Sequence, residues 1–217
     1  MSQDFADRIV AARAPRRETK SLIYQHALRL FAERGYARTS LRDIAEAVGL
    51  EVPSLYTHIA SKQSLLFDLM EFGNSELLAR LEAAVAAVPG DRPLDQLYVL
   101  VRENVISHCR HRDQTKVVFT EIRELADRQR PRILSLRRSI EDLFRDTIGR
   151  AVDAGSAREV DVTVTAFGVL AIGRGAATWY HDDGELTPED IGDLYAEQVV
   201  RGILAPKLAA KWSRPQL

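Results

Sequence analysis

The chain has 217 residues, of which 46% are hydrophobic and 28% are charged, a composition typical of a globular protein with one or two domains. Its single cysteine, Cys109, excludes a disulfide within the chain and favours a reducing compartment, so we expect a cytoplasmic protein. The first 20 residues contain no apolar stretch of signal-peptide length.

Charge is unevenly distributed, although the net charge is only −1. Residues 1–42 contain nine Lys and Arg residues against four acidic residues, whereas residues 181–197 contain seven acidic residues and no Lys or Arg. This asymmetry predicts an anionic partner for the N-terminal part of the chain. A solvated basic tail is the alternative that charge alone leaves open.

Helical periodicity extends along almost the whole chain, and no stretch shows the sustained polar and apolar alternation of hairpin strands. Breaks divide the chain into about nine helices, so the predicted fold class is all-α. The breaks fall at Gly35, Gly49, Pro89–Gly90, Arg112–Asp113, Arg130–Pro131, Ala154–Gly155 and Asp182–Gly184.

Two short helices are predicted near the N-terminus after a longer one at about residues 17–33, which stops at Gly35. Ser40 and Asp43 fit a capping box at the start of the second helix, Leu41–Val48.

The third helix is expected at about residues 51–59, after a sharp turn that begins at Gly49. Pro53 lies in its first turn, where the missing N–H removes no helix bond. Two short helices joined by a glycine-containing turn are typical of a helix-turn-helix. Helix pairs of this length also occur in enzymes and scaffolds.

The segment LFAERGYARTSLRDIAEAVGLEVPSLYTHIASKQSLL, residues 30–66, resembles the DNA-binding domain of TetR-type transcriptional repressors. The matching framework positions are Phe31, Gly35, Tyr36, Thr39, Ser40, Ile44, Ala45, Gly49, Leu55, Tyr56, His58, Lys62 and Leu65. The resemblance implies a ligand-responsive DNA-binding regulator, most simply a repressor that binds a palindromic operator as a homodimer. It also implies a three-helix DNA-binding domain followed by a larger helical domain for ligand binding and dimerisation.

The third helix is then the recognition helix, which docks into a major groove. Tyr56, His58 and Lys62 end in donors suited to phosphate oxygens, and the resemblance makes Lys62 the phosphate anchor. The residues expected to contact DNA are Thr39, Ser40, Val52, Pro53, Ser54, Tyr56, Thr57, His58 and Lys62. Glu51 departs from the family, which commonly has a small hydroxyl residue there, and it would repel phosphate or accept from a cytosine amino group.

The predicted domains are a flexible arm at residues 1–14, the helix-turn-helix domain at 15–62, and the ligand-binding and dimerisation domain at 63–217. By resemblance, the last two helices, at about 158–180 and 188–204, form the dimer's four-helix bundle. The residues expected at the dimer interface are Gly168, Ala171, Gly175, Ile191, Leu194, Tyr195, Gln198, Val199 and Ile203. Packing within a single chain is the alternative.

The most apolar stretch, residues 162–180, approaches membrane-spanning length, but Arg174, three threonines and three glycines favour a buried helix of a soluble protein. Arg174 either pairs with an acid or lines the ligand cavity. The candidate ligand-binding residues are Arg174, Trp179, Tyr180, Arg123 and His108.

The C-terminal segment from Ala176 to Leu204 loosely resembles TetR-type regulators of fatty-acid, steroid and other acyl-CoA catabolism. The resemblance makes a CoA thioester or a related lipid or steroid catabolite the expected effector. Arginines that could serve an anionic CoA moiety are Arg102, Arg110, Arg123, Arg132, Arg137 and Arg138.

Metal binding and catalysis are not expected. His108 and His111 are three residues apart near the end of a predicted helix, but a metal site needs more ligands. The chain has no nucleophile motif, no phosphate-binding glycine loop and no recognisable carboxylate pair, so an α-helical enzyme with an incidental helix-turn-helix is the disfavoured alternative. We expect no cofactor and no membrane partner.

Overall fold

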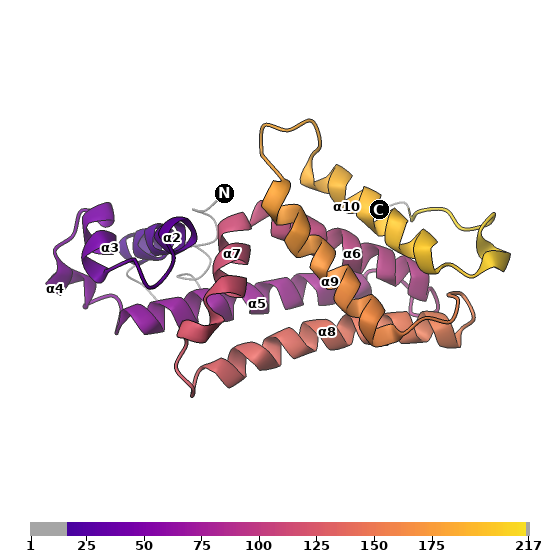
Figure 1. The fold of residues 1–217 in the computed structure, drawn as a ribbon, viewed down its shortest axis with the longest axis horizontal. Helices are drawn as coiled ribbons and strands as arrows, with labels where there is room; N and C mark the ends of the chain where they lie inside the picture. The colour runs from indigo at the N-terminus through magenta and orange to yellow at the C-terminus, as the bar shows by residue number, and fades with distance from the viewer. Residues whose placement is uncertain (1–16, 216–217) are drawn as a thin grey trace. The chain divides into compact units, whose positions relative to one another are not determined.

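The computed structural model describes residues 17–215, and this part of the chain is almost entirely helical (Figure 1). Within the described residues there are nine α-helices and two 3-10 helices, and the one β-bridge, between Ala157 and Leu204, lies outside any strand. The all-α prediction with about nine helices is therefore confirmed. The predicted flexible arm at residues 1–14 lies outside the described residues.

The helices are α2 (Arg17–Arg34), α3 (Leu41–Val48), α4 (Val52–Leu55), α5 (Lys62–Ala86), α6 (Pro93–Arg110), α7 (Arg112–Thr120), α8 (Arg130–Asp153), α9 (Val162–Trp179) and α10 (Pro188–Ile203), with 3-10 helices at Ile122–Glu124 and Pro206–Leu208.

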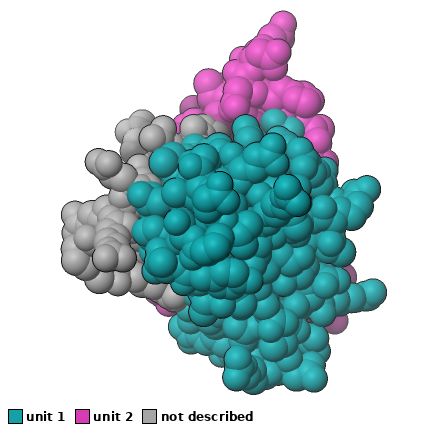
Figure 2. Space-filling view, turned by 90° about the vertical axis from the view of Figure 1, so that its left-hand side faces the viewer, with its two compact units in different colours: residues 1–75, 111–136 teal, residues 76–110, 137–217 magenta. Residues whose placement is uncertain are grey.

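Two compact units divide the chain, and Figure 2 colours them separately. The first unit contains the chain up to Ser75 together with residues 111–136, and the second contains residues 76–110 and 137–217. Helices α5 and α8 each contribute residues to both units. The predicted functional boundary after residue 62 coincides with the start of α5 and stays a prediction.

The first unit has a core built around α2, which contacts α3 and α7. Gly35 (φ 86°) and Gly49 (φ 74°) adopt left-handed backbone conformations after α2 and α3, which glycine accepts without steric cost. The Tyr24 hydroxyl donates to Asp68 Oδ2 at 2.5 Å and so links α2 to α5. The core includes Ile23, Ala27, Leu30, Phe31, Ile44, Ala45, Leu55, Ile59, Leu65, Leu66, Leu69, Met70, Val117 and Leu125.

The second unit is organised around α6, which contacts both α9 and α10. Helix α10 approaches α6 closely because Gly192 has no side chain: a Cβ at that position would lie 3.0 Å from the Arg102 carbonyl oxygen. The core of this unit includes Leu97, Tyr98, Leu100, Val101, Val105, Phe144, Ile148, Ala166, Val169, Ala176, Ile191, Ala196 and Val200.

Capping residues determine where α9 and α10 begin. A capping box joins Thr187 and Asp190 at the start of α10, with Pro188 in the first turn. Helix α9 begins at Val162 rather than near residue 158, because the Asp161 carboxylate accepts from the Val164 N–H at 2.8 Å and caps the helix there.

Helix α9 differs from the buried helix that the sequence predicts. Among the described residues it is the one helix long and apolar enough to cross a membrane by length and composition, and 28% of that window is buried within the chain. The prediction of burial was wrong for a single chain, because α9 packs on α6 along one side and exposes apolar residues along the other.

Candidate functional site

The start of α3 is held by local hydrogen bonds. At the start of α3, the Asp43 N–H donates to Ser40 Oγ at 3.1 Å, and the Ser40 N–H donates to Asp43 Oδ2 at 2.7 Å. The Ser40 hydroxyl, which also donates to Asp43 Oδ2, and after it the Ser40 N–H lower the pKa of the Asp43 carboxyl. The predicted capping box is confirmed, and it orients α3 for the turn that Gly49 completes.

Helix α4 is shorter than predicted, because the expected helix at residues 51–59 has only one α-helical turn. The next residues form tighter i to i+3 bonds: the Thr57 N–H donates to the Ser54 carbonyl at 3.1 Å and the His58 N–H to the Leu55 carbonyl at 2.9 Å. Leu55 and Ile59 are buried in the first unit's core. The core therefore holds this segment in place more than its own helix does.

The outward face of this segment carries Pro53, Ser54, Tyr56 and Thr57, all exposed. Tyr56 is 54% exposed. The Thr57 hydroxyl donates to the Ser54 carbonyl oxygen at 2.7 Å. Val52 and His58, the other predicted DNA contacts here, lie half-buried at the edges of this face. The structure thus groups six of the nine predicted DNA contacts on one short segment.

The hydroxyl groups of Thr39 and Ser40 are placed differently from the prediction. Thr39 is 1% exposed, and its hydroxyl donates to the Gly35 carbonyl oxygen at 2.9 Å, so it faces the interior. Ser40 is exposed, but its hydroxyl forms the cap of α3 with Asp43. Both side chains shape the turn in this structure.

Lys62, predicted as the phosphate anchor, reaches back from the first turn of α5 to the turn between α2 and α3. Its ammonium donates to the carbonyl oxygens of Tyr36 at 2.9 Å and Thr39 at 2.8 Å, and lies 4.1 Å from the centroid of the Tyr36 ring. This structural role was missed by sequence reasoning. No local pattern signals a lysine that bonds carbonyls more than twenty residues earlier.

An exposed stripe runs along α9 with helical spacing of three and four residues. Phe167 at its centre is 53% exposed. Its members are Val164, Phe167, Gly168, Ala171, Arg174, Gly175, Thr178 and Trp179. Apart from the adjacent residues and the backbone of α9 itself, no described atom lies within 4 Å of a Cβ built on Gly168 or Gly175. We call this set the α9 stripe; it contains three of the predicted interface residues.

On α10 the predicted interface residues divide between two faces. Leu194 is 51% exposed and Gln198 is also exposed, whereas Tyr195 and Val199 are half-buried. The remaining two, Ile191 and Ile203, are buried in the chain's own core. Placing these two at the interface was wrong. The face of α10 that packs inside the chain consists of Ile191, Gly192, Ala196, Val200 and Ile203, so it includes both of them.

The five candidate ligand residues do not form one cluster. Arg123 belongs to the first unit, and the other four belong to the second. Arg174 and Trp179 are exposed on the α9 stripe, whereas Tyr180 and His108 are buried. Burial raises the pKa of the Tyr180 hydroxyl, with a smaller contribution from its hydrogen bond to Asp182.

The positive charge of Arg174, on α9, acts on Arg137, on α8. Burial and the positive charge of Arg174 together lower the pKa of Arg137.

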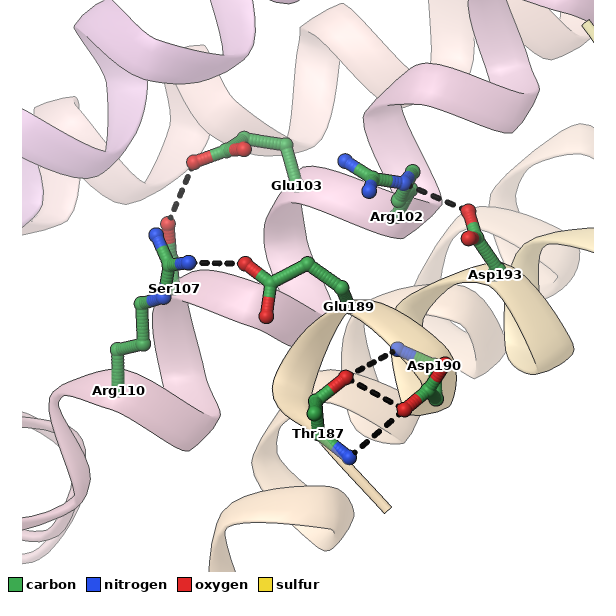
Figure 3. A network of polar contacts seen from close by, with 8 residues as sticks. All are labelled: Arg102, Glu103, Ser107, Arg110, Thr187, Glu189, Asp190 and Asp193. Atoms are coloured by element: carbon green, nitrogen blue, oxygen red, sulfur yellow. Dashed lines mark hydrogen bonds and ion pairs between the residues drawn. The ribbon is translucent and has the colours of Figure 1, made fainter. Parts of the chain in front are cut away.

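Polar contacts link α6 to α10 at two points (Figure 3). Asp193 Oδ1 accepts from Arg102 Nε at 2.6 Å and from the Tyr98 hydroxyl at 2.9 Å, and Arg110 pairs with Glu189 one helical turn earlier on α10. Burial and the bond to Asp193 raise the pKa of Tyr98 to about 12. We call these contacts the α6–α10 clamp.

His108 and His111 do not share a helix, since His108 lies in α6 and His111 follows its end, at the N-cap position of α7 but without a side-chain cap bond. Among the described residues, no group of three His, Cys, Asp or Glu side chains could hold a metal ion.

Two family models match the chain. The model described as "Bacterial regulatory proteins, tetR family" matches residues 23–69, which include α3, α4 and the Lys62 contact. The model described as "Tetracyclin repressor-like, C-terminal domain" matches residues 90–203, from just before α6 to the end of α10. The second match covers more than half of the chain.

Curated relatives and solved structures agree with these matches. The HTH-type transcriptional repressor KstR2 of Mycobacterium tuberculosis is 28% identical over 179 residues, covering 82% of this chain and 88% of the relative. The structure of ketosteroid transcriptional regulator KstR2 of M. tuberculosis has a TM-score of 0.80 at 26% identity, over 88% of this chain and 97% of that one. AibR, solved in complex with isovaleryl coenzyme A and operator DNA, has a TM-score of 0.72 at 29% identity, over 87% and 100%.

Proposed function

Because this chain belongs to the TetR family of bacterial transcriptional regulators, we propose that it represses transcription as a homodimer and leaves its operator when a CoA thioester binds. The observation that carries the proposal is the pair of family matches, which cover both the DNA-binding segment and the larger helical part. A bacterial operator lies in the cytoplasm, so we place the protein there. We propose no catalytic role, since the relatives are regulators.

DNA contact is proposed for the outward face of the α4 segment. Pro53, Ser54 and Thr57, with Val52 at the edge, would face base edges in the major groove, and Tyr56 and His58 would donate to phosphate oxygens. We assign Thr39 and Ser40 mainly to holding the turn, since their hydroxyls have acceptors within the chain. Lys62 would act mainly through the same turn.

Dimerisation is proposed through the α9 stripe together with Leu194 and Gln198 of α10. Exposed apolar side chains next to exposed glycines permit close packing of a second copy of the same helices. Two copies place two recognition segments on an inverted repeat and multiply the discrimination that one segment can achieve.

The effector class is proposed from AibR, whose structure holds isovaleryl coenzyme A with operator DNA, and from KstR2, which is named a ketosteroid regulator. Isovaleryl coenzyme A, a thioester, and a ketosteroid both contain a carbonyl group. We propose that such a molecule binds in the second unit, where His108 and Tyr180 are buried and Arg174 lies on α9. Arg123, in the first unit, is retained only as a weaker candidate.

The test is footprinting of the purified protein on the DNA around its own gene, followed by titration with acyl-CoA thioesters and free CoA. We expect protection of an inverted repeat and release by a thioester, with free CoA as the control that lacks the acyl group. Failure to bind any fragment would overturn the regulator function, whereas binding without release by any thioester would overturn the effector class alone.

A Gly175→Leu variant tests the dimer. Apart from the adjacent residues and the backbone of α9 itself, no described atom lies within 4 Å of the Cβ position of Gly175, so leucine should be tolerated in a single chain. We expect weaker dimerisation and weaker operator binding, measured by sedimentation and gel shift. A Gly175→Leu protein that stays dimeric with full operator affinity would remove α9 from the interface.

A further inference from the structure

Asn104, in the middle of α6, is a buried polar side chain without a hydrogen-bond partner among the described residues. It is 0% exposed, and neither Oδ1 nor Nδ2 has a hydrogen-bond partner within the described residues. Among the described residues, Asn104 is the one side chain for which both a donor and an acceptor atom are buried without a partner. A carboxamide in this condition has lost its bonds to water and gained none.

The surroundings of Asn104 show that it is accommodated by a specific close approach. A Cβ built on Gly173 of α9 would overlap Asn104 Nδ2 and would lie 2.6 Å from His108 Cδ2, so the α9 backbone passes directly over these two side chains. Asn104 and His108 are four residues apart and lie on the same side of α6. Glycine at position 173 therefore leaves room for an amide at this helix contact.

The buried side chains of Asn74 and Thr147, unlike that of Asn104, have hydrogen-bond partners. The Asn74 amide donates to the Met70 carbonyl oxygen at 2.8 Å, and the Thr147 hydroxyl donates to the Leu143 carbonyl oxygen at 2.9 Å. Leucine, of similar size, would fill the position of Asn104 without a desolvation penalty. The presence of an amide at this buried position is therefore explained by a state of the protein in which a partner forms a hydrogen bond with it.

We infer that Asn104 recognises the effector by donating a hydrogen bond from Nδ2 to a carbonyl oxygen of the ligand. The inference rests on the proposed function and names the group that reads the effector. A neutral acceptor fits best, because Val101 and Val105 of α6 and Val169 and Ala176 of α9, close to Asn104 and Gly173 in sequence, belong to the apolar core of the second unit. A thioester carbonyl and a steroid ketone share this chemistry.

The unpaired amide also couples binding to structure. In the packing described, Asn104 is closed in by Gly173, so a ligand reaches it only when α6 and α9 separate locally. The closed state leaves the amide unpaired and the ligand-bound state pairs it, so the effector binds the open state preferentially and shifts the population toward it. The same helix α6 carries Arg102 and Tyr98 of the α6–α10 clamp, which connects this change to a helix of the proposed dimer face.

The ligand test compares isovaleryl-CoA with its thioether analogue, 3-methylbutyl-CoA, which lacks the carbonyl oxygen. Calorimetric titration of the full chain should show the thioester binding roughly tenfold more tightly than the thioether, which is the effect of one net hydrogen bond. Asn104→Leu should remove this preference by weakening the thioester alone. A parallel titration with androst-4-ene-3,17-dione distinguishes a ketone effector from a thioester.

A second measurement tests the unpaired amide without any ligand. Asn104→Leu should raise the melting temperature by about 2–4 °C, whereas the matched control Asn74→Leu should lower it because it breaks the bond to Met70. A fall in the melting temperature of Asn104→Leu would show an internal partner and overturn the inference.

The outcomes separate the two proposals. A wild-type protein that prefers the thioester, together with an Asn104→Leu variant that keeps the preference, overturns the role of Asn104 and leaves the effector class standing. A wild-type protein that binds neither the thioester nor the ketone overturns the effector class, and the carbonyl recognition falls with it.

Discussion

Lys62→Met offers the sharpest test of how the DNA-binding turn is held. Methionine keeps most of the length of the side chain but removes the ammonium, which donates to the carbonyl oxygens of Tyr36 and Thr39 and lies over the Tyr36 ring. A hydrogen bond from a charged donor contributes about 1.5–3 kcal/mol, and partial exposure of the site lets water replace part of this. We therefore expect the free energy of unfolding to fall by about 2–3 kcal/mol.

The assay is urea denaturation of the full chain, with Lys116→Met as the control. Lys116 is exposed on α7, and its replacement should change the free energy of unfolding by less than about 0.5 kcal/mol. Operator affinity measured over a range of salt concentrations completes the test. Unchanged stability of Lys62→Met, with a slope of log K against log salt reduced by about 0.9, would indicate a pure phosphate contact and refute the structural role.

Three further outcomes are expected. Phe167→Glu, at the centre of the α9 stripe, should convert the dimer to monomer in sedimentation and weaken operator binding, while circular dichroism stays unchanged because the side chain is exposed. Tyr56→Phe should weaken operator binding by about tenfold or less in gel shifts with no change in unfolding, since its hydroxyl faces outward. Tyr98 has a raised pKa in the folded state, so its contribution to stability is complete below pH 10 and is lost as the pH rises toward about 12; Tyr98→Phe should flatten alkaline unfolding curves over this range.

Local signals in the sequence predict much of this fold correctly. The bounds Leu41–Val48, the capping box at Ser40 and the glycine stop at Gly49 all agree with the structure. Each depends on interactions within about four residues, and such interactions can be read from a single sequence.

The features that the sequence did not predict depend on contacts between distant residues. The α4 segment tightens because Leu55 and Ile59 enter a core made by α2 and α5, and Lys62 finds its acceptors in an earlier turn. Ile191 and Ile203 point into the chain because Gly192 brings α10 against α6. Asn104 looked unremarkable in a sequence that gives no indication of which helix passes over it.

Helix α4 has four residues, and an isolated helix of that length has no stability of its own. Its position depends on Leu55 and Ile59, which never face DNA. In a genetic screen for loss of repression, substitutions at these two positions should therefore give the same phenotype as substitutions of residues that contact DNA directly. Pro53 and Ser54, in contrast, are exposed and absent from the core, so they can change with little harm to folding. With the proposed DNA contacts, mutation of the outward residues would redirect the protein to new promoters, while selection on the inward ones keeps the chain foldable.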